Sequence, residues 1–322
     1  MKRIGILTSG GDAPGMNACI RAAVRAATAG DIEILGINRG FSGLIENDMR
    51  SLDRRTVANI IHLGGTILGT SRSTEFRTLE GRKKAFFVLE EHGIEGLIII
   101  GGEGSFLGGS LLQDESGVKI IGIPGTIDND VYGSEMTIGF DTAVNCALEA
   151  IDRIRDTALS HQRLFFVEVM GRHTGFIALE SGIGGGAEEL IIPEEGMNAE
   201  ELSSRLQKSF SLGKKSAIVA VAEAGRPGNS VDLAKEVEQR TGFETKVCIL
   251  GHLQRGGSPT ARDRILASKL GVAAVNALMQ GKSGLMAGEI RQKITFTPIQ
   301  ETWERQKSLD SELRALMGVL CD

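Results

Sequence analysis

The chain has 322 residues, of which 41% are hydrophobic and 24% are charged, and its formal net charge is -5 at pH 7. The length predicts roughly two domains, and the apolar and charged fractions are ordinary for a soluble globular protein. The negative net charge argues against a general nucleic-acid surface.

Short apolar runs alternate with helical patterns along the chain. This alternation predicts a parallel sheet flanked by helices. The predicted strands are Arg3 to Thr8, Ile32 to Ile37, Leu97 to Ile100, Lys119 to Ile123, Leu164 to Val169, Leu190 to Ile192, Ala217 to Ala222 and Lys246 to Leu250. The predicted helices are Gly15 to Ala29, Gly81 to His92, Asp141 to Leu159, Ala199 to Leu212, Val231 to Thr241 and Thr260 to Met279.

A glycine-rich turn, Thr8-Ser-Gly-Gly-Asp-Ala-Pro-Gly-Met-Asn17, follows the first predicted strand. Its glycines do not fit the Gly-x-Gly-x-x-Gly spacing of dinucleotide-binding proteins, which disfavours an NAD-linked dehydrogenase. The P-loop, a second nucleotide-binding motif, is not matched by the chain either. Gly281-Lys-Ser283 resembles the end of a P-loop, but Asn276 stands where the first glycine is required, and a predicted helix precedes it.

The loop Gly101-Gly-Glu-Gly-Ser105 follows the strand predicted at Leu97 to Ile100. Backbone N–H groups without neighbouring Cβ atoms can approach a phosphate closely, and a following helix would direct its positive end at the same anion. Glu103 adds an oxygen ligand suited to Mg²⁺. A tight turn before a helix is the alternative interpretation of any one glycine-rich loop.

Two carboxylates, Asp128 and Asp130, lie in the loop Pro124-Gly-Thr-Ile-Asp-Asn-Asp130. This loop follows the strand predicted at Lys119 to Ile123, and ligands of open α/β sheets collect beyond the carboxyl ends of strands. The loop could therefore share one crevice with the loop that holds Glu103. The alternative is two solvated aspartates that cap the next helix.

Basic residues also occur at the ends of predicted strands. Arg163 stands at the start of one strand, Arg172 follows its carboxyl end, and Arg255 follows another. Arginine presents a planar fork of donors that matches phosphate oxygens, so Arg172 and Arg255 are candidate phosphate clamps; surface salt bridges are the alternative. Glu223 could accept hydrogen bonds from sugar hydroxyls.

The four cysteines, Cys19, Cys146, Cys248 and Cys321, are far apart, which argues against a zinc site or a disulfide framework. No apolar signal region precedes the first strand, and no run approaches about 18 apolar residues. We therefore expect a cytoplasmic protein without a membrane partner.

Five motifs resemble those of one family closely and occur in the same order along the chain as in that family. They are Gly-Gly-Asp-Ala-Pro-Gly-Met-Asn, Gly-Gly-Glu-Gly-Ser, Pro-Gly-Thr-Ile-Asp-Asn-Asp, Met-Gly-Arg-His and Gly-His-Leu-Gln-Arg-Gly-Gly-Ser-Pro. The chain resembles bacterial ATP-dependent 6-phosphofructokinase over about residues 1 to 310, and least beyond Phe296. The resemblance implies two Rossmann-like three-layer αβα domains with mainly parallel sheets and the active site in the cleft between them. It places the ATP-binding domain at 1–138 plus 251–304 and the fructose 6-phosphate-binding domain at 139–250 plus 305–322.

The resemblance also implies the reaction, in which the γ-phosphoryl group of ATP passes to the 1-hydroxyl of fructose 6-phosphate. Asp128 is then the base that accepts the hydroxyl proton, while Thr126 and Arg172 stabilise the transferring group. Glu103 takes the Mg²⁺ position. The matching ATP-site residues are Gly11, Arg72, Ser73, Gly102, Glu103, Gly104 and Ser105. The matching substrate contacts are Thr126, Ile127, Asp128, Arg163, Met170, Gly171, Arg172, Glu223, Lys246, His252, Leu253, Gln254 and Arg255.

Assembly and regulation are further implications of the resemblance. Arg163 and Lys246 match positions that reach the substrate of a neighbouring subunit in the family, so a homotetramer is expected. An effector site for ADP or phosphoenolpyruvate is expected between subunits, although Leu212 and Ser216 stand where cationic or histidine side chains are usual. Its matching residues are Arg21, Arg25, Arg54, Asn59, Arg155, Gly186, Glu188, Lys214, Lys215 and Ser216.

The phosphoryl donor is expected to be ATP. In the related pyrophosphate-using enzymes, aspartate tends to replace the residue that matches Gly104, and lysine the one that matches Gly125. Two other positions depart from the family pattern: Glu103 replaces the commoner aspartate, and Lys246 replaces an arginine. Three alternatives remain open: a pyrophosphate-dependent phosphofructokinase, another kinase with a Gly-Gly-x-Gly-Ser loop such as an NAD or lipid kinase, and a catalytically silent sugar-phosphate sensor.

Overall fold

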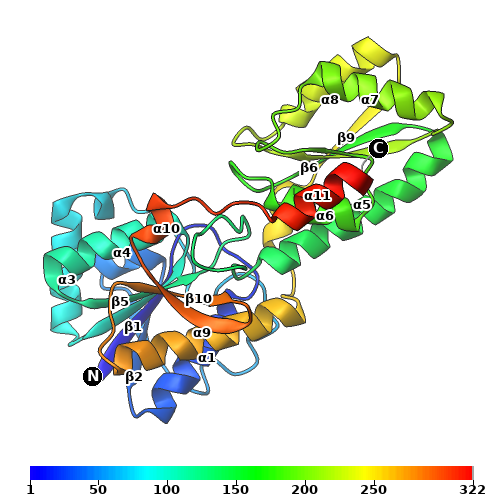
Figure 1. The fold of residues 1–322 in the computed structure, drawn as a ribbon. Coiled ribbons are helices and arrows are strands. Elements are labelled where there is room, and N and C mark those ends of the chain that lie inside the picture. The colour runs from blue at the N-terminus through cyan, green and yellow to red at the C-terminus, as the bar shows by residue number, and fades with distance from the viewer. Residues whose placement is uncertain (321–322) are drawn as a thin grey trace. The chain divides into compact units, whose positions relative to one another are not determined.

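The structure is a computed structural model that describes residues 1–320 of the chain. The chain divides into two compact units, each assembled from separate stretches (Figure 1). The first unit contains residues 1–127, 131–141 and 255–307. The second contains residues 128–130, residues 142–254 and the chain from Ser308 onward.

A seven-stranded sheet forms the centre of the first unit, with the strand order β11-β10-β5-β4-β1-β2-β3. Five strands are parallel, whereas β3 and β11 pair antiparallel at the two edges. The strands are β1 (Arg3–Thr8), β2 (Glu33–Ile37), β3 (Met49–Leu52), β4 (Gly96–Gly101), β5 (Lys119–Pro124), β10 (Leu285–Ile290) and β11 (Lys293–Pro298).

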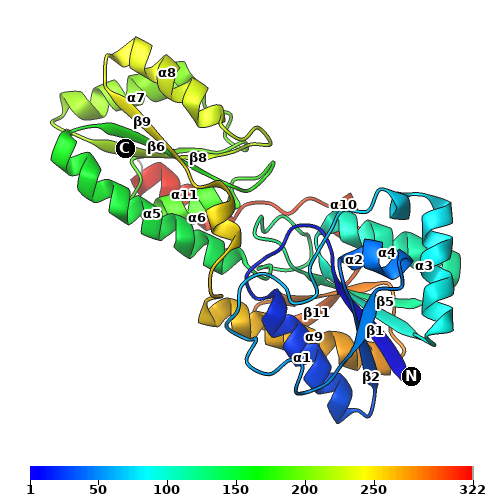
Figure 2. The ribbon, with the colours of Figure 1, turned by 180° about the vertical axis from the view of Figure 1, so that it is seen from behind.

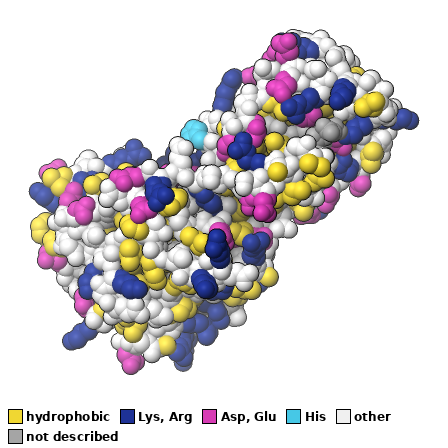
Figure 3. All heavy atoms as spheres, viewed as in Figure 1, with side chains coloured by type: hydrophobic (Ala, Val, Ile, Leu, Met, Phe, Trp, Pro, Cys, Tyr) yellow, Lys and Arg dark blue, Asp and Glu magenta, His cyan; other side chains and the backbone are white. Residues whose placement is uncertain are grey.

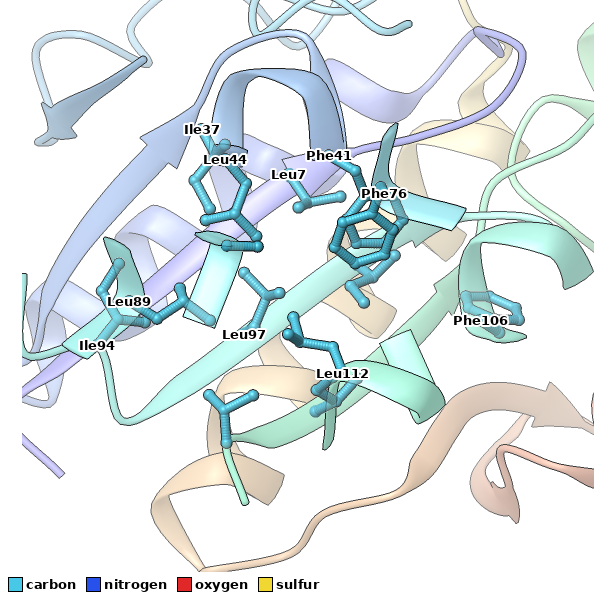
Figure 4. Close-up of a cluster of buried hydrophobic side chains, with 14 of the residues drawn as sticks. Leu7, Ile37, Phe41, Leu44, Phe76, Leu89, Ile94, Leu97, Phe106 and Leu112 are labelled. Atoms are coloured by element: carbon cyan, nitrogen blue, oxygen red, sulfur yellow. The ribbon is translucent and has the colours of Figure 1, made fainter. Parts of the chain in front are cut away.

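Helices cover both faces of this sheet (Figures 1 and 2). One face carries α1 (Met16–Ala29) and α9 (Ala261–Met279); the other carries α2 (Gly40–Ile45), α3 (Leu79–Glu91), α4 (Glu103–Ser116) and α10 (Glu301–Glu304), with the short 3₁₀ helix η1 (Glu75–Arg77) beside α3. Beneath α2, α3 and α4, alternate strand residues such as Leu7, Leu97 and Ile99 are buried in one apolar cluster (Figure 4). Phe41 and Phe76 stack there with ring centroids 3.9 Å apart.

The second unit has a four-stranded parallel sheet with the order β7-β8-β6-β9. Leu164 and Phe166 of β6 pack with the helices α7 and α8 into one apolar core, and α5, α6 and α11 lie on the other face (Figure 1). The strands are β6 (Leu164–Val169), β7 (Glu189–Ile191), β8 (Ala217–Ala222) and β9 (Thr245–Ile249). The helices are α5 (Phe140–His161), α6 (Phe176–Gly184), α7 (Ala199–Ser211), α8 (Asn229–Thr241), α11 (Ser311–Leu320) and the 3₁₀ helix η2 (Gly251–Arg255), which ends at the unit boundary.

The predicted fold class is confirmed: both sheets are mainly parallel and both have helices on each face. Every predicted strand and helix is present, with ends within two residues of the prediction. The sequence interpretation did not include β3, β10 and β11, or the helices α2, α6, α10 and α11. The helix predicted to precede Gly281-Lys-Ser283, the segment that resembles the end of a P-loop, is α9.

Three further observations concern membrane-spanning helices, the cysteines and the surface charge. No helix within residues 1–320 is long and apolar enough to cross a membrane. Cys19, Cys146 and Cys248 carry free thiols, whereas Cys321 lies outside the described residues. On the face shown in Figure 3, cationic and anionic side chains are interspersed over both units.

Candidate active site

Three of the predicted site loops begin at one edge of the sheet in the first unit. β1, β4 and β5 are parallel neighbours, so the turns after Thr8, Gly101 and Pro124 leave the sheet at the same end. Backbone hydrogen bonds link them: Ser9 N–H donates to Ile100 O at 2.9 Å, and Gly125 N–H donates to Gly101 O at 2.9 Å. The structure therefore brings these loops together, as expected for strand ends in an α/β sheet.

The glycines before α4 differ in their surroundings. A Cβ atom at Gly101 would lie 2.6 Å from Ser9 O and 2.7 Å from Ser105 Oγ, so these nearby residues of the same chain leave no room for a side chain there. At Gly102 and Gly104 a Cβ would meet no atom of the described chain within 4 Å. These two positions face open space, where a ligand's phosphate could approach the backbone at the start of α4.

Glu103 is the first residue of α4 and is half-buried. Among residues 1–320, no group of three or more His, Cys, Asp or Glu side chains is arranged to hold a metal ion. A single carboxylate still fits Mg²⁺, because this ion usually keeps several waters and binds through one or two carboxylates plus substrate phosphates. The open space at Gly102 and Gly104 leaves room for such phosphates.

Asp128 and Arg172 lie together in the second unit. Asp128 is 1% exposed, and its Oδ2 lies 3.3 Å from Arg172 Nε. Arg172 has a φ of 52°, and Gly171 before it has a φ of 142°. This sharp turn at the end of β6 is closed by Thr174, whose N–H and hydroxyl both bond to Gly171 O. The turn directs the Arg172 side chain back toward the aspartate.

Glu223 joins the same cluster from the end of β8. Its Oε1 accepts a hydrogen bond from the backbone N–H of Arg172 at 3.0 Å. β6 and β8 are adjacent parallel strands, so residues that follow them meet at one edge. The second unit therefore pairs the Asp128 carboxylate with the Arg172 guanidinium and holds the Arg172 backbone with Glu223, an arrangement that suits proton transfer beside an anionic group.

Other predicted site residues take part in structural contacts. Thr126 O accepts from the Thr137 hydroxyl at 2.6 Å, and Ile127 is fully buried. In the first unit, Arg255 Nη1 donates to Asp12 O at 3.0 Å. A Cβ at Gly11 would lie 2.5 Å from Arg255 Nη1, so a side chain at this position would require the Arg255 guanidinium to shift.

The remaining substrate-site candidates differ in exposure. Gln254 is fully buried and accepts from Met170 N–H at 3.4 Å, so its position is explained by its role in holding β6. His252 and Leu253 are exposed on η2. Arg72 is exposed, and the Ser73 hydroxyl accepts from Phe76 N–H at 3.1 Å at the start of η1.

Arg163 and Lys246 share one partner, Glu244, which the sequence interpretation missed. Arg163 Nε lies 2.9 Å from Glu244 Oε2, and Lys246 Nζ lies 2.9 Å from Oε1. The two cations hold the pKa of the Glu244 carboxyl below its usual range. Arg163 precedes β6 whereas Arg172 follows it, so the two arginines stand about 20 Å apart along the strand. One substrate phosphate cannot contact both arginines of a single chain.

The effector candidates fall in both units. In the second unit, Arg155 donates to Gly186 O at 2.5 Å and pairs with Glu188 at 3.3 Å. Lys214, Lys215 and Ser216 immediately precede β8, whose Ile218 N–H donates to Glu188. In the first unit, Arg21 and Arg25 lie one turn apart on α1, and Arg54 and Asn59 are exposed.

Comparisons with known proteins agree with the motifs. The phosphofructokinase family model matches residues 3–278. The chain is 56% identical over 320 residues to "ATP-dependent 6-phosphofructokinase 1" of Thermus thermophilus, with 99% of each chain covered. It is 51% identical over 316 residues to the ATP-dependent 6-phosphofructokinase of Halalkalibacterium halodurans, with 98% of each covered.

Solved structures show the same relationship at the level of the fold. Phosphofructokinase from Saccharomyces cerevisiae has a TM-score of 0.89 and 34% identity; the match covers all of this chain and 48% of the yeast chain, so this chain spans about half the yeast chain's length. A pyrophosphate-dependent phosphofructokinase from Marinobacter aquaeolei has a TM-score of 0.86 at 24% identity, covering 100% of this chain and 92% of the other. This second likeness shows the fold alone.

Proposed function

Because this chain belongs to the phosphofructokinase family, we infer that it is an ATP-dependent 6-phosphofructokinase. It transfers the γ-phosphoryl group of ATP to the 1-hydroxyl of fructose 6-phosphate, giving fructose 1,6-bisphosphate and ADP. The geometric observation that carries this function is the buried Asp128 carboxylate 3.3 Å from Arg172 Nε. A base and a cation at one point are what phosphoryl transfer to a hydroxyl requires.

Asp128 is the proposed base, and Arg172 is the proposed stabiliser of the transferring group. In the free protein the ion pair holds Asp128 Oδ2 toward Arg172, whose side chain is 55% exposed. Negative charge on a transferring phosphoryl group would compete for the same guanidinium. The carboxylate is then left to accept the proton of the attacking hydroxyl. Thr126, two residues before the base, assists from the same loop.

ATP binds, in this proposal, at the loops after β1 and β4, with its phosphates at the start of α4. Support comes from the open space at Gly102 and Gly104 and from the positive end of α4. Glu103 would hold Mg²⁺, which neutralises charge on the phosphates when bound. Two observations favour ATP over pyrophosphate: the identity to ATP-dependent relatives reaches 56%, and position 104 lacks the aspartate of the pyrophosphate enzymes.

A homotetramer is proposed because one chain alone cannot bring Arg163 and Lys246 to the substrate that its own Arg172 contacts. Arg163 and Lys246 lie at the opposite end of β6 and β9 from Arg172 and His252. A neighbouring subunit could present them to the substrate. Regulation by ADP or phosphoenolpyruvate, through Arg21, Arg25 and the cluster at Arg155, stays a prediction, as does the cytoplasmic location.

A purified-protein assay tests the function. It crosses ATP and pyrophosphate with fructose 6-phosphate and other sugar phosphates, on wild type and on Asp128→Asn. We expect ATP-driven formation of fructose 1,6-bisphosphate, and a kcat about 10²- to 10⁴-fold lower in Asp128→Asn. Asp152→Asn, an exposed carboxylate on α5, is the matched control and should keep wild-type kcat. Product formed from pyrophosphate but not from ATP would sink the proposal.

A further inference from the structure

Glu168 is a buried carboxylate that the proposed reaction does not use. It lies near the end of β6 and is 1% exposed. Its neighbours on the same face of the strand, Leu164 and Phe166, belong to the apolar core beneath α7 and α8. A carboxylate is costly to bury there unless hydrogen bonds replace its water.

Three hydrogen bonds to this carboxylate come from the start of α8. Oε1 accepts from Gly228 N–H at 2.7 Å, and Oε2 accepts from the N–H of Ser230 at 3.0 Å and from its hydroxyl at 2.6 Å. Gly228, the N-cap residue of α8, has no side chain to cap the helix. Glu168 therefore supplies the cap from the adjacent strand, at the positive end of the helix.

The segment fixed in this way carries Glu223. Residues 223–228 connect β8 to α8, and the Asn229 side chain donates to Glu223 O at 3.1 Å. Arg226 N–H donates to the same oxygen at 2.8 Å. Ala224 has a φ of 49°, a left-handed conformation that is costly for a residue with a Cβ atom. Such a turn persists because its surroundings hold it.

We propose that Glu168 is a positioning residue for fructose 6-phosphate. By fixing the start of α8, it holds Glu223 at the site, and Glu223 in turn holds the backbone of Arg172 at 3.0 Å. Glu168 pairs in register with Val221, two residues before Glu223, so the cap and the site residue lie on neighbouring stretches of the same sheet. The inference rests on the proposed function.

The first test is kinetic. Glu168→Gln keeps the shape of the side chain but leaves one acceptor oxygen where two are used. We expect KM for fructose 6-phosphate to rise about tenfold, the effect of losing one hydrogen bond to a charged group, while KM for ATP changes less than twofold. Ser230→Ala removes a single hydrogen bond and should raise the same KM about threefold. The effects of the two substitutions on KM should be less than additive, because both disrupt the same contact between Glu168 and the start of α8.

A matched variant separates positioning from general destabilisation. Val237 is fully buried in the core under α8, distant from residues 223–228 along the helix. Val237→Ala should lower the midpoint of thermal unfolding and leave KM for fructose 6-phosphate unchanged. Amide hydrogen exchange gives a readout without substrate: exchange at Gly228 and Ser230 should be faster in Glu168→Gln than in wild type.

Two results would overturn the inference: an unchanged KM for fructose 6-phosphate in folded Glu168→Gln, or an equal rise in Val237→Ala. If Glu168→Gln does not fold, Ser230→Ala decides, and an unchanged KM there overturns the inference too. Wild type is assayed first. A wild type that forms no fructose 1,6-bisphosphate from ATP removes the proposed function and the inference with it, whereas an active wild type with unaffected variants removes the inference alone.

Discussion

Glycines that look alike in the sequence have different tasks at the candidate nucleotide loop. Gly101 is required by the chain itself, because Ser9 O and Ser105 Oγ occupy the space of a Cβ. Gly125 is also crowded, since a Cβ would lie 2.8 Å from Ile100 Cγ2 and 3.2 Å from Met16 Cε. Gly104 faces open space. Of the two positions linked with donor choice, Gly104 is therefore the one that packing does not already explain.

Gly104→Asp tests donor choice at this position. The protein should fold normally because the new side chain points into open space. Its carboxylate would repel the phosphates of ATP, so we expect kcat/KM for ATP to fall about 100-fold, the cost of placing like charges at close range. Steady-state kinetics with ATP measures this.

Gly104→Asn is the control for this substitution, because asparagine has the same shape without the charge. A fall of equal size in both variants would assign the effect to bulk rather than to charge. Unchanged ATP kinetics in Gly104→Asp would contradict the placement of the phosphates at α4.

The cysteines should differ in reactivity with their burial. Burial raises the pKa of the Cys19 thiol far above its ordinary value, and it also raises the pKa of the half-buried Cys146 and Cys248. The thiolate is the reactive form, and the raised pKa keeps it scarce at pH 8. We expect iodoacetamide to leave Cys19 unlabelled in native protein at pH 8 and to label it in urea, as read by peptide mass spectrometry. Rapid native labelling of Cys19 would contradict its place in the core.

At the scale of elements, the sequence pattern identified most of the strands whose residues are buried on both faces, although it missed β10. β1, β4, β5 and β8 are continuous apolar runs, and the matching predictions are confirmed. β3 and β11 are edge strands with mostly exposed or half-exposed residues, so their sequences carry a weak apolar signal. α6 contains two glycines among its nine residues and is flanked by Gly175 and Gly185, and glycine weakens a helical pattern.

Close helix packing depends on a glycine that the sequence did not mark. A Cβ at Gly271 of α9 would lie 2.7 Å from the backbone oxygen of Cys19 in α1. Gly271→Ala gains helix propensity of about 1 kcal/mol but pushes α1 and α9 apart, which costs about 1–3 kcal/mol or more. We expect a lower midpoint of thermal unfolding, measured by calorimetry.

Gly318→Ala in α11 is the matched substitution for this packing test. A Cβ there meets no described atom within 4 Å, so the same propensity gain should appear without a clash. The midpoint should stay equal or rise. If Gly271→Ala is as stable as wild type, the close approach of α1 and α9 does not limit stability.

The site was predictable where a motif carries the chemistry and unpredictable where a distant partner does. Asp128, Arg172 and Glu223 follow predicted strands, and the structure joins them in one cluster. Glu244 and Glu168 act through side chains brought to them by pairing of β6 with β9 and β8. Strand pairing across tens of residues is not visible in local sequence, so neither glutamate could be identified beforehand.

At the scale of the whole molecule, the proposed tetramer can be tested by mixing two inactive variants. Asp128→Asn loses its base but keeps Arg163, whereas Arg163→Ala loses its contribution to the neighbouring site but keeps Asp128. If each site draws on two subunits, refolding an equal mixture creates some sites in which both residues are intact. Random pairing across a two-fold interface gives up to about a quarter of wild-type activity.

Each variant refolded alone is the control for this mixing experiment, and both should stay nearly inactive. Sedimentation of the refolded mixture gives the oligomeric state independently. A mixture no more active than its parents would place Arg163 outside the neighbouring site.

Each of the two units is assembled from separate stretches of one chain, which limits how recombination between related genes can exchange a whole unit. A single crossover between two related genes would exchange parts of both units at once and combine unmatched cores. Exchange of residues 142–254 between two breakpoints would move β6, β7, β8 and β9 together as one block. Chimeric genes that survive selection should therefore share those two breakpoints, near 141 and 254, rather than a single junction at the middle of the chain.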